Sequence, residues 1–427
     1  MSARVDGEAR PSVDYPDRTA PLLSIGGAVV FSVIIVILAA ISAMAAYANS
    51  FGRLTPEVAR NLWPANGFVL AELADMEMGR LINPDTKAIP SELPADIRDL
   101  SERAIRLEPM AVAAIRDLAY FYQGHGESGL TRARLLMRQA AALTRRDSVV
   151  NLWLADDYFR QNQSRPALML YDATLRTSTF AASLLLPRMA AALRDPRAPT
   201  DFEMLLRENP PWHDSFWAAV IQDGTALRNA YVLRERLHKL GTPMPSLHDA
   251  LLIQQLAAAH MFSEAFDLFA VASGRSEKTD GEMLQNADFR RVSQFEPIDW
   301  RLISEGRYGA ELDQERHVLA VSALPRAVGT VAQQLAYLPQ GEYTVDVRYS
   351  NQGKAGPKPL ALQASCAELN GARTFERTIL LPQSGEWRLR QDTFCRYVWI
   401  SLRLSPEEAG QGFDVEIERL SIKSPAR

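Results

Sequence analysis

The sequence predicts a multidomain fold: a single transmembrane helix, an all-α region of helical hairpins, and an all-β sandwich. Three observations predict it. No Asp, Glu, Lys, Arg or His lies between Arg18 and Arg53. From Thr55 onwards apolar residues recur with a helical period, and after about residue 285 they recur with a period of two. The polar stretch 274–285 between the two patterns is the expected linker.

The uncharged stretch predicts a membrane-spanning helix over residues 21–49, after a polar tail at 1–20 that we expect to be disordered. About 20 apolar residues can cross a bilayer as a helix, and a soluble helix of such length would show a polar face. The alternative is a cleavable signal peptide, for which Ala43-Met44-Ala45 offers a small-residue site. The length of the apolar run favours an uncleaved anchor. Arginines flank the stretch equally on both sides, so the positive-inside rule gives no orientation.

The composition excludes several classes of protein. With 427 residues and a net charge of −4, the chain is long enough for two or three domains and lacks the basic surface of a nucleic-acid-binding protein. Its 6 histidines form no HxxxH or HExxH motif, and no GxSxG, P-loop or GxGxxG motif is present. We therefore expect neither an enzyme nor a cofactor.

The chain has 2 cysteines, Cys366 and Cys395. No Cys-x-x-Cys motif or cysteine–histidine cluster accompanies them, so we expect no metal site. They form a disulfide if their domain faces an oxidising compartment, or else they pack as two buried thiols. The strand pattern favours the thiols, because Cys395 is out of phase with Val398 and the apolar residues that alternate after it.

An internal repeat lies in the helical region. The motif Leu118-Ala119-Tyr120-Phe121-Tyr122 recurs as Leu154-Ala155-Asp156-Asp157-Tyr158, and a third, weaker copy begins at Leu256. In the first two copies a turn follows, and then a second helix with a small residue near its start, Ala133 or Ala167. Small residues at fixed places let two helices approach closely. The repeat therefore predicts stacked helical hairpins.

This pattern resembles the tetratricopeptide repeat, in which a large–small pair precedes an aromatic residue and an alanine lies early in the second helix. The match is clearest over residues 110–180, and the family's usual Trp and closing Pro are displaced or missing. The resemblance implies a solenoid over 55–273 with a concave groove for a protein partner. We expect the repeat-signature residues to be structural: Leu118, Ala119, Tyr122, Leu154, Ala155, Tyr158, Ala167 and Tyr171.

The C-terminal region, 286–427, predicts a β-sandwich. Apolar and polar residues alternate over 343–349, 360–366, 398–404 and 413–417, and the last pattern slips phase before Leu420. Gly- and Pro-containing turns separate these short runs, and no long helical pattern interrupts them. Many short strands without helices are typical of a sandwich.

The edges of this region resemble jelly-roll domains of the galactose-binding-like, carbohydrate-binding-module type. The region opens with Asn286-Ala287-Asp288-Phe289 and closes on a long alternating strand, as those domains often do. The resemblance implies a jelly roll, with glycan binding as one function. Sugar rings stack on aromatic faces, so the candidate carbohydrate-binding residues are aromatics and a polar neighbour: Trp300, Arg301, Trp387, Tyr397 and Trp399. The alternative is that each of these aromatics is a core residue of the sandwich.

These features predict a single-pass protein of the inner (cytoplasmic) membrane, with the bulk of the chain in the periplasm or otherwise outside the cytoplasm. Its expected function is that of a non-catalytic scaffold of a bacterial-type cell envelope. Its repeats would bind a protein partner, and its jelly roll would serve as a docking domain. The scaffold would act in surface-polysaccharide assembly or export, a role that rests on resemblance alone. One alternative is a carbohydrate-binding envelope protein in which the jelly roll is the binding site. Another is a glycan hydrolase, which would need a pocket with two facing carboxylates.

Overall fold

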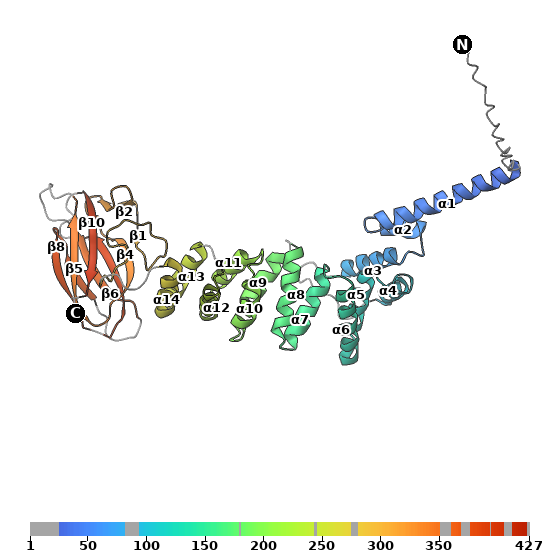
Figure 1. Ribbon diagram of the computed structural model, residues 1–427, viewed down its shortest axis with the longest axis horizontal. Helices are drawn as coiled ribbons and strands as arrows, with labels where there is room; N and C mark the ends of the chain where they lie inside the picture. Colours follow the sequence, from blue (N-terminus) through green and yellow to red (C-terminus); the bar gives the residue numbers. More distant parts are fainter. Residues whose placement is uncertain are drawn as a thin grey trace, which may run out of the picture. The chain divides into compact units, whose positions relative to one another are not determined.

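A computed structural model of the protein describes residues 25–81, 94–178, 181–242, 246–274, 281–350, 360–368, 376–392, 394–404 and 412–424. In these ranges 14 helices are followed by ten strands (Figure 1). The chain divides into two compact units, Met1–Arg145 and Arg146–Arg427. The predicted tail at 1–20 lies outside the described residues. The predicted order, a helical region before an all-β region, is confirmed.

The first helix, α1 (Ile25–Phe51), is long and apolar. Its segment Val29–Phe51 is the one helix in the described ranges that is long and apolar enough to cross a membrane. Every side chain from Val29 to Ala43 is exposed, whereas a core helix of a soluble protein would be covered. The predicted helix is therefore present, with these side chains free to face lipid.

The rest of the first unit is helical. A core of small and aliphatic residues joins the end of α1 to the next helices, and Ala48, Ala59, Leu70 and Ala104 belong to it. Its helices are α2 (Pro56–Leu62), α3 (Gly67–Leu81), α4 (Ala95–Leu107), α5 (Val112–Gln123) and α6 (Gly126–Leu143).

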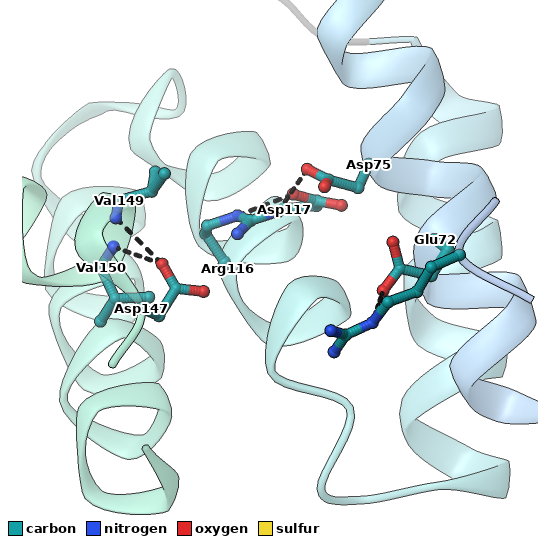
Figure 2. A network of polar contacts seen from close by, with 8 residues as sticks. Glu72, Asp75, Arg116, Asp117, Asp147, Val149 and Val150 are labelled. Atoms are coloured by element: carbon teal, nitrogen blue, oxygen red, sulfur yellow. Dashed lines mark hydrogen bonds and ion pairs between the residues drawn. The ribbon is translucent and has the colours of Figure 1, made fainter. Parts of the chain in front are cut away.

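The second unit begins with eight helices. Asp147 caps the first of them, because its carboxylate accepts the backbone N–H groups of Val149 and Val150, each at 3.0 Å (Figure 2). Alternate helices pack on one another: α9 on α11 and α11 on α13, and likewise α8, α10, α12 and α14 in succession. The helices are α7 (Ser148–Arg160), α8 (Ser164–Thr177), α9 (Ala182–Ala192), α10 (Ala198–Leu206), α11 (His213–Asp223), α12 (Leu227–Lys239), α13 (Ser246–Ala258) and α14 (Phe262–Ser273).

A β-sandwich of two antiparallel, five-stranded sheets completes this unit, as the alternation predicted. One sheet has the order β1-β4-β9-β6-β7 and the other β2-β3-β10-β5-β8. The phase slip predicted before Leu420 is a register shift between Ile417 and Arg419, where β10 pairs with β5. The strands are β1 (Arg301–Leu302), β2 (Tyr308–Asp313), β3 (Val318–Ala323), β4 (Thr330–Tyr337), β5 (Gly341–Tyr349), β6 (Leu360–Cys366), β7 (Glu376–Leu380), β8 (Gly385–Gln391), β9 (Tyr397–Leu404) and β10 (Phe413–Lys423).

The helices of the second unit and its sandwich share one apolar core. Phe295, Ile298 and Leu335 of the sandwich belong to the same buried cluster as Leu268 of α14. At its edge the ring of Tyr397 lies 5.2 Å from that of Phe262 and 5.5 Å from that of Phe266, centroid to centroid. We call this contact the aromatic joint. Tyr397 lies on β9, the central strand of its sheet, and both phenylalanines lie on α14.

Candidate functional site

The repeat-signature residues pack helix against helix. Leu118 and Ala119 of α5 and Leu154 and Ala155 of α7 are buried, as is Ala167 on α8. Tyr122 and Tyr158 are half-buried. Tyr171 is buried and donates a hydrogen bond to the Asp156 carboxylate at 3.3 Å. Burial, followed by the nearby Asp156 carboxylate, raises the pKa of Tyr171 to about 12.

A pocket of about 460 Å³ lies between α7–α8 and α9–α10 in the second unit. We call it the α7–α10 pocket. Its floor is apolar, since Leu168, Ala198 and Phe202 are buried, and its rim carries amide, hydroxyl, carboxylate and guanidinium groups. A few polar groups around an apolar floor are typical of binding pockets. Its lining residues are Phe159, Asn162, Ser164, Leu168, Ala191, Ala192, Asp195, Arg197, Ala198 and Phe202.

The rim of this pocket is held by hydrogen bonds. The Ser164 hydroxyl donates to the Asp201 carboxylate at 2.5 Å. The carboxylate of Asp195 accepts the backbone N–H of Arg197 at 2.8 Å, and the Asn229 amide donates to the carbonyl oxygen of Asp195 at 3.1 Å. The turn between α9 and α10 is thus fixed from both sides. Sequence analysis did not find this pocket, because its walls come from four helices and two turns whose proximity no repeat signature encodes.

The predicted carbohydrate-binding aromatics do not form an open surface. Trp300 is fully buried, which excludes it as a stacking platform and corrects the prediction. Trp387 is half-buried and packs against the sandwich core, on the same side of β8 as the buried Leu389. Tyr397 and Trp399 pack against the helical core, and only Arg301 is exposed. Packing therefore accounts for the aromatics that we had assigned to sugar binding.

Cys366 and Cys395 form a disulfide, with Cα atoms 5.9 Å apart. The phase argument against it was wrong for a structural reason. Cys395 precedes β9, which begins at Tyr397, so the alternation of that strand does not apply to it. Glu368 lies close enough to the two sulfurs for the three residues to resemble a metal site. A disulfide has no thiolate, however, and metal binding by cysteine needs the thiolate.

A second pocket, of about 630 Å³, lies at the β2–β3 edge of the sandwich. We call it the β2–β3 pocket. The ring of Tyr308 lies against Gly329, where a Cβ atom would come within 2.2 Å of it, so a larger residue there would displace the ring. Partial burial and the Glu305 carboxylate raise the pKa of Tyr308. The lining residues are Ser304, Glu305, Gly306, Arg307, Tyr308, Gly309, Ser322, Ala323, Leu324, Gly412 and Asp414.

This second pocket contains two carboxylates, Glu305 and Asp414, together with Arg307. Two carboxylates in one pocket are what the hydrolase alternative requires, and the carbohydrate-binding alternative also has polar groups to use here. Arg307 is already engaged, because its guanidinium donates to the carbonyl oxygen of Pro325 at 2.7 Å. The glycines that flank Arg307-Tyr308 were the one sequence signal that could have indicated this site.

Buried charges elsewhere are structural. In the first unit, Figure 2 shows the Arg116 guanidinium between Asp75 of α3 and Asp117 of α5; it pairs with both carboxylates, and its Nε lies 3.4 Å from Asp117 Oδ1. In the sandwich, burial raises the pKa of Glu282, whose carboxylate accepts the backbone N–H of Ile422 at 2.9 Å. That contact fastens the start of the sandwich to β10.

Comparisons with known proteins assign this chain to no family. No protein-family model and no curated protein matches the chain. One solved structure that the search found is described as "Structure of Arabinose-Bound MgGH51 a-L-Arabinofuranosidase Crystal Type 1". The identity is 13% and the TM-score 0.23; the match covers 35% of this chain and 27% of that chain. A likeness this weak supports no argument about fold or activity.

Proposed function

We propose that this chain is a membrane-anchored, non-catalytic scaffold of a bacterial-type cell envelope, which binds another protein through its helices. The observation that carries the proposal is the α7–α10 pocket, an apolar hollow with a fixed polar rim on a helical region. Its volume falls within the roughly 300–1,000 Å³ that is usual for binding pockets. The repeat signature supports a TPR-like solenoid, and such folds commonly bind peptide segments.

The proposed occupant is a protein segment that inserts one large apolar side chain. Leu168 and Phe202 would contact that side chain. The rim groups of Asn162 and Arg197 would hydrogen-bond the backbone of the segment on either side. A buried anchor with polar groups around it is the usual form of a binding hot spot.

The disulfide supports a location outside the cytoplasm. Structural disulfides persist in oxidising compartments and are rare in the cytosol. Cys366 and Cys395 both follow α1 in the chain. If α1 crosses the inner membrane once, the helices and the sandwich after it lie on one side, which would be the periplasmic side.

The test uses a substitution that fills the α7–α10 pocket. Ala192→Trp should abolish co-purification of a partner from the native membrane, because the indole would occupy the space of the incoming side chain. Leu247→Trp is the matched control, since Leu247 is 65% exposed and lies on α13, away from the pocket. Both variants should keep the wild-type melting temperature. A photo-cross-linking residue at Ala192 should give one discrete product that the same residue at Leu247 does not.

A second candidate function is glycan binding at the β2–β3 pocket, which would make the sandwich the binding site. The observation that favours it is the aromatic Tyr308 beside the polar groups of Glu305 and Asp414. Envelope-type oligosaccharides titrated against the full chain should then bind, and Asp414→Asn should weaken that binding. Release of new reducing ends during the titration would indicate hydrolysis and contradict the non-catalytic assignment.

A further inference from the structure

The segment after α1 exposes a stripe of large apolar side chains. Phe51, Leu54, Val58 and Leu62 are 49%, 78%, 48% and 38% exposed. Val58 and Leu62 are four residues apart and lie along one side of α2, whereas Leu54 lies in the turn before it and Phe51 ends α1. We call these four residues the α2 stripe. Large apolar groups that stay exposed together usually mark a contact surface.

The α2 stripe is fixed to the end of α1. Gly52 makes the turn between the two helices, and a Cβ atom there would lie 2.3 Å from the carbonyl oxygen of Ala48, so only glycine fits. The hydroxyl groups of Tyr47 and Thr55 are 3.0 Å apart, within hydrogen-bonding distance. Ala59 of α2 is buried with Ala48 of α1. The stripe therefore has a fixed position at the end of α1.

Two ion pairs neutralise most of the charge nearby, and Arg60 in the last turn of α2 remains as one exposed basic residue. Arg53 lies 3.1 Å from Glu72, and Glu57 lies 3.8 Å from Arg80. This segment thus lacks the excess of basic residues that would favour anionic lipids. Two amphipathic aromatic residues, Tyr47 and Trp63, are half-buried beside it. Tyrosine and tryptophan are enriched where a membrane protein meets the headgroup region.

We propose that α2 lies in the interface of the bilayer that α1 crosses, with the α2 stripe inserted at the boundary between headgroups and acyl chains. Interfacial helices bury their apolar face by about 5–10 Å at this level. The occupant is lipid, because the stripe begins at Phe51, the last residue of the helix that is long and apolar enough to cross the bilayer. The proposal does not depend on the partner of the α7–α10 pocket. It requires only that α1 spans the membrane.

The consequence is a two-point attachment of the first unit to the membrane. A lone helix leaves the following domain free to tilt about a single point. A second contact through α2, whose partner Ala48 ties it to α1, removes that freedom within the first unit.

The experiment measures depth in the bilayer. The full chain, with its native disulfide intact, is reconstituted into phosphatidylcholine vesicles and carries one fluorescent thiol label. The labelled variants are Leu54→Cys on the α2 stripe, Ile35→Cys within α1, and Leu135→Cys, which is 68% exposed on α6 of the same unit. Brominated phospholipids quench labels in the bilayer, and iodide quenches labels in water.

We expect brominated lipid to quench the Leu54 label several-fold more than the Leu135 label, with iodide giving the reverse order. Adding phosphatidylglycerol should change neither order, because the segment carries only one basic residue outside its ion pairs, Arg60. Equal iodide quenching at Leu54 and Leu135 would overturn the proposal, and so would protection of Leu54 from both quenchers, which would indicate a protein contact or a second copy of the chain. Quenching of the Ile35 label by brominated lipid tests separately whether α1 spans the bilayer.

Discussion

Arg234 on α12 and Asp249 on α13 form a two-point ion pair. Arg234 Nε lies 2.7 Å from Asp249 Oδ1, and Arg234 Nη2 lies 3.0 Å from Oδ2. Both side chains are only 5% exposed. The guanidinium also donates to the carbonyl oxygen of Thr242 at 3.5 Å. One buried pair thus joins successive helices of the second unit, and its arginine also binds Thr242, just beyond the end of α12.

Asp249→Ala should be strongly destabilising, because it leaves the Arg234 charge buried without its carboxylate. Removing one partner of a buried pair costs about 3–5 kcal/mol. The control is Glu235→Ala on α12, the helix of Arg234, where the pair with Lys239 is exposed and the expected loss is below about 1 kcal/mol. Urea unfolding of the detergent-solubilised chain measures both. Equal losses would contradict the assignment of a structural role to the buried pair.

Stability should fall on mild acidification because of His213. The indole N–H of Trp217 donates to His213 Nε2 at 3.2 Å, so that nitrogen must be unprotonated. Burial is the main cause that lowers the pKa of His213, and the charge of Arg234 adds to it. The unfolded chain, with a pKa of about 6.5, then takes up the proton more readily than the folded chain. Stability is therefore full above pH of about 6.5 and declines below it.

The melting temperature should drop between pH 7.5 and pH 5.5, and His213→Gln should reduce that drop. His260→Gln is the control, because His260 is exposed at the end of α13. If both variants lose as much melting temperature on acidification as the wild type does, groups other than His213 cause the acid sensitivity.

Leu154→Asp should unfold the helices of the second unit. Leu154 is 4% exposed, and a carboxylate placed there would be buried without a partner. We expect a loss of more than about 3 kcal/mol, the scale for burying an unpaired polar or charged group. Leu184→Asp makes the same chemical change at a side chain that is 46% exposed, and it should leave the melting curve almost unchanged. An unaltered melting curve for Leu154→Asp would argue against the repeat register.

Reduction should destabilise the sandwich. The disulfide closes a loop with a sequence separation of 29, for which loop entropy corresponds to about 3–4 kcal/mol. A reductant should therefore lower the unfolding midpoint of the wild type but not that of Cys366→Ala/Cys395→Ala. Thiol trapping of the chain in freshly isolated membranes tests the compartment. Alkylation before any reduction would contradict a location in an oxidising compartment.

The sequence predicted the helices and strands well because hydrophobic period is a local property. Val398, Ile400 and Leu402 alternate in the sequence and face the sandwich core in β9. The same alternation placed Tyr397 and Trp399 on the other face but could not say what covers it. The covering rings belong to α14, far away in sequence, so only the tertiary structure reveals that this face packs against a helix rather than facing solvent.

The candidate sites were harder to predict for the same reason. Both pockets are lined by residues from several helices or strands and the turns beside them, so they depend on contacts between distant segments. Trp300 shows a second limit of prediction from sequence, which is that the burial of a single aromatic residue is not evident from its neighbours. Its polar neighbours Asp299 and Arg301 suggested a binding site, yet the ring fills the sandwich core and packs 6.1 Å from the ring of Phe289. Composition around an aromatic residue does not report its burial.

The aromatic joint has a mechanical consequence. Phe262, Phe266 and Tyr337 all place their rings against that of Tyr397, with centroids 5.2 to 5.5 Å away. Tyr397 begins the central strand of one sheet. A mechanical force applied to the sandwich would therefore be transmitted through this ring to α14. A partner that exerts force on the sandwich would then deform the helices of the second unit as well. The sandwich would be mechanically coupled to these helices rather than joined to them by a flexible connection.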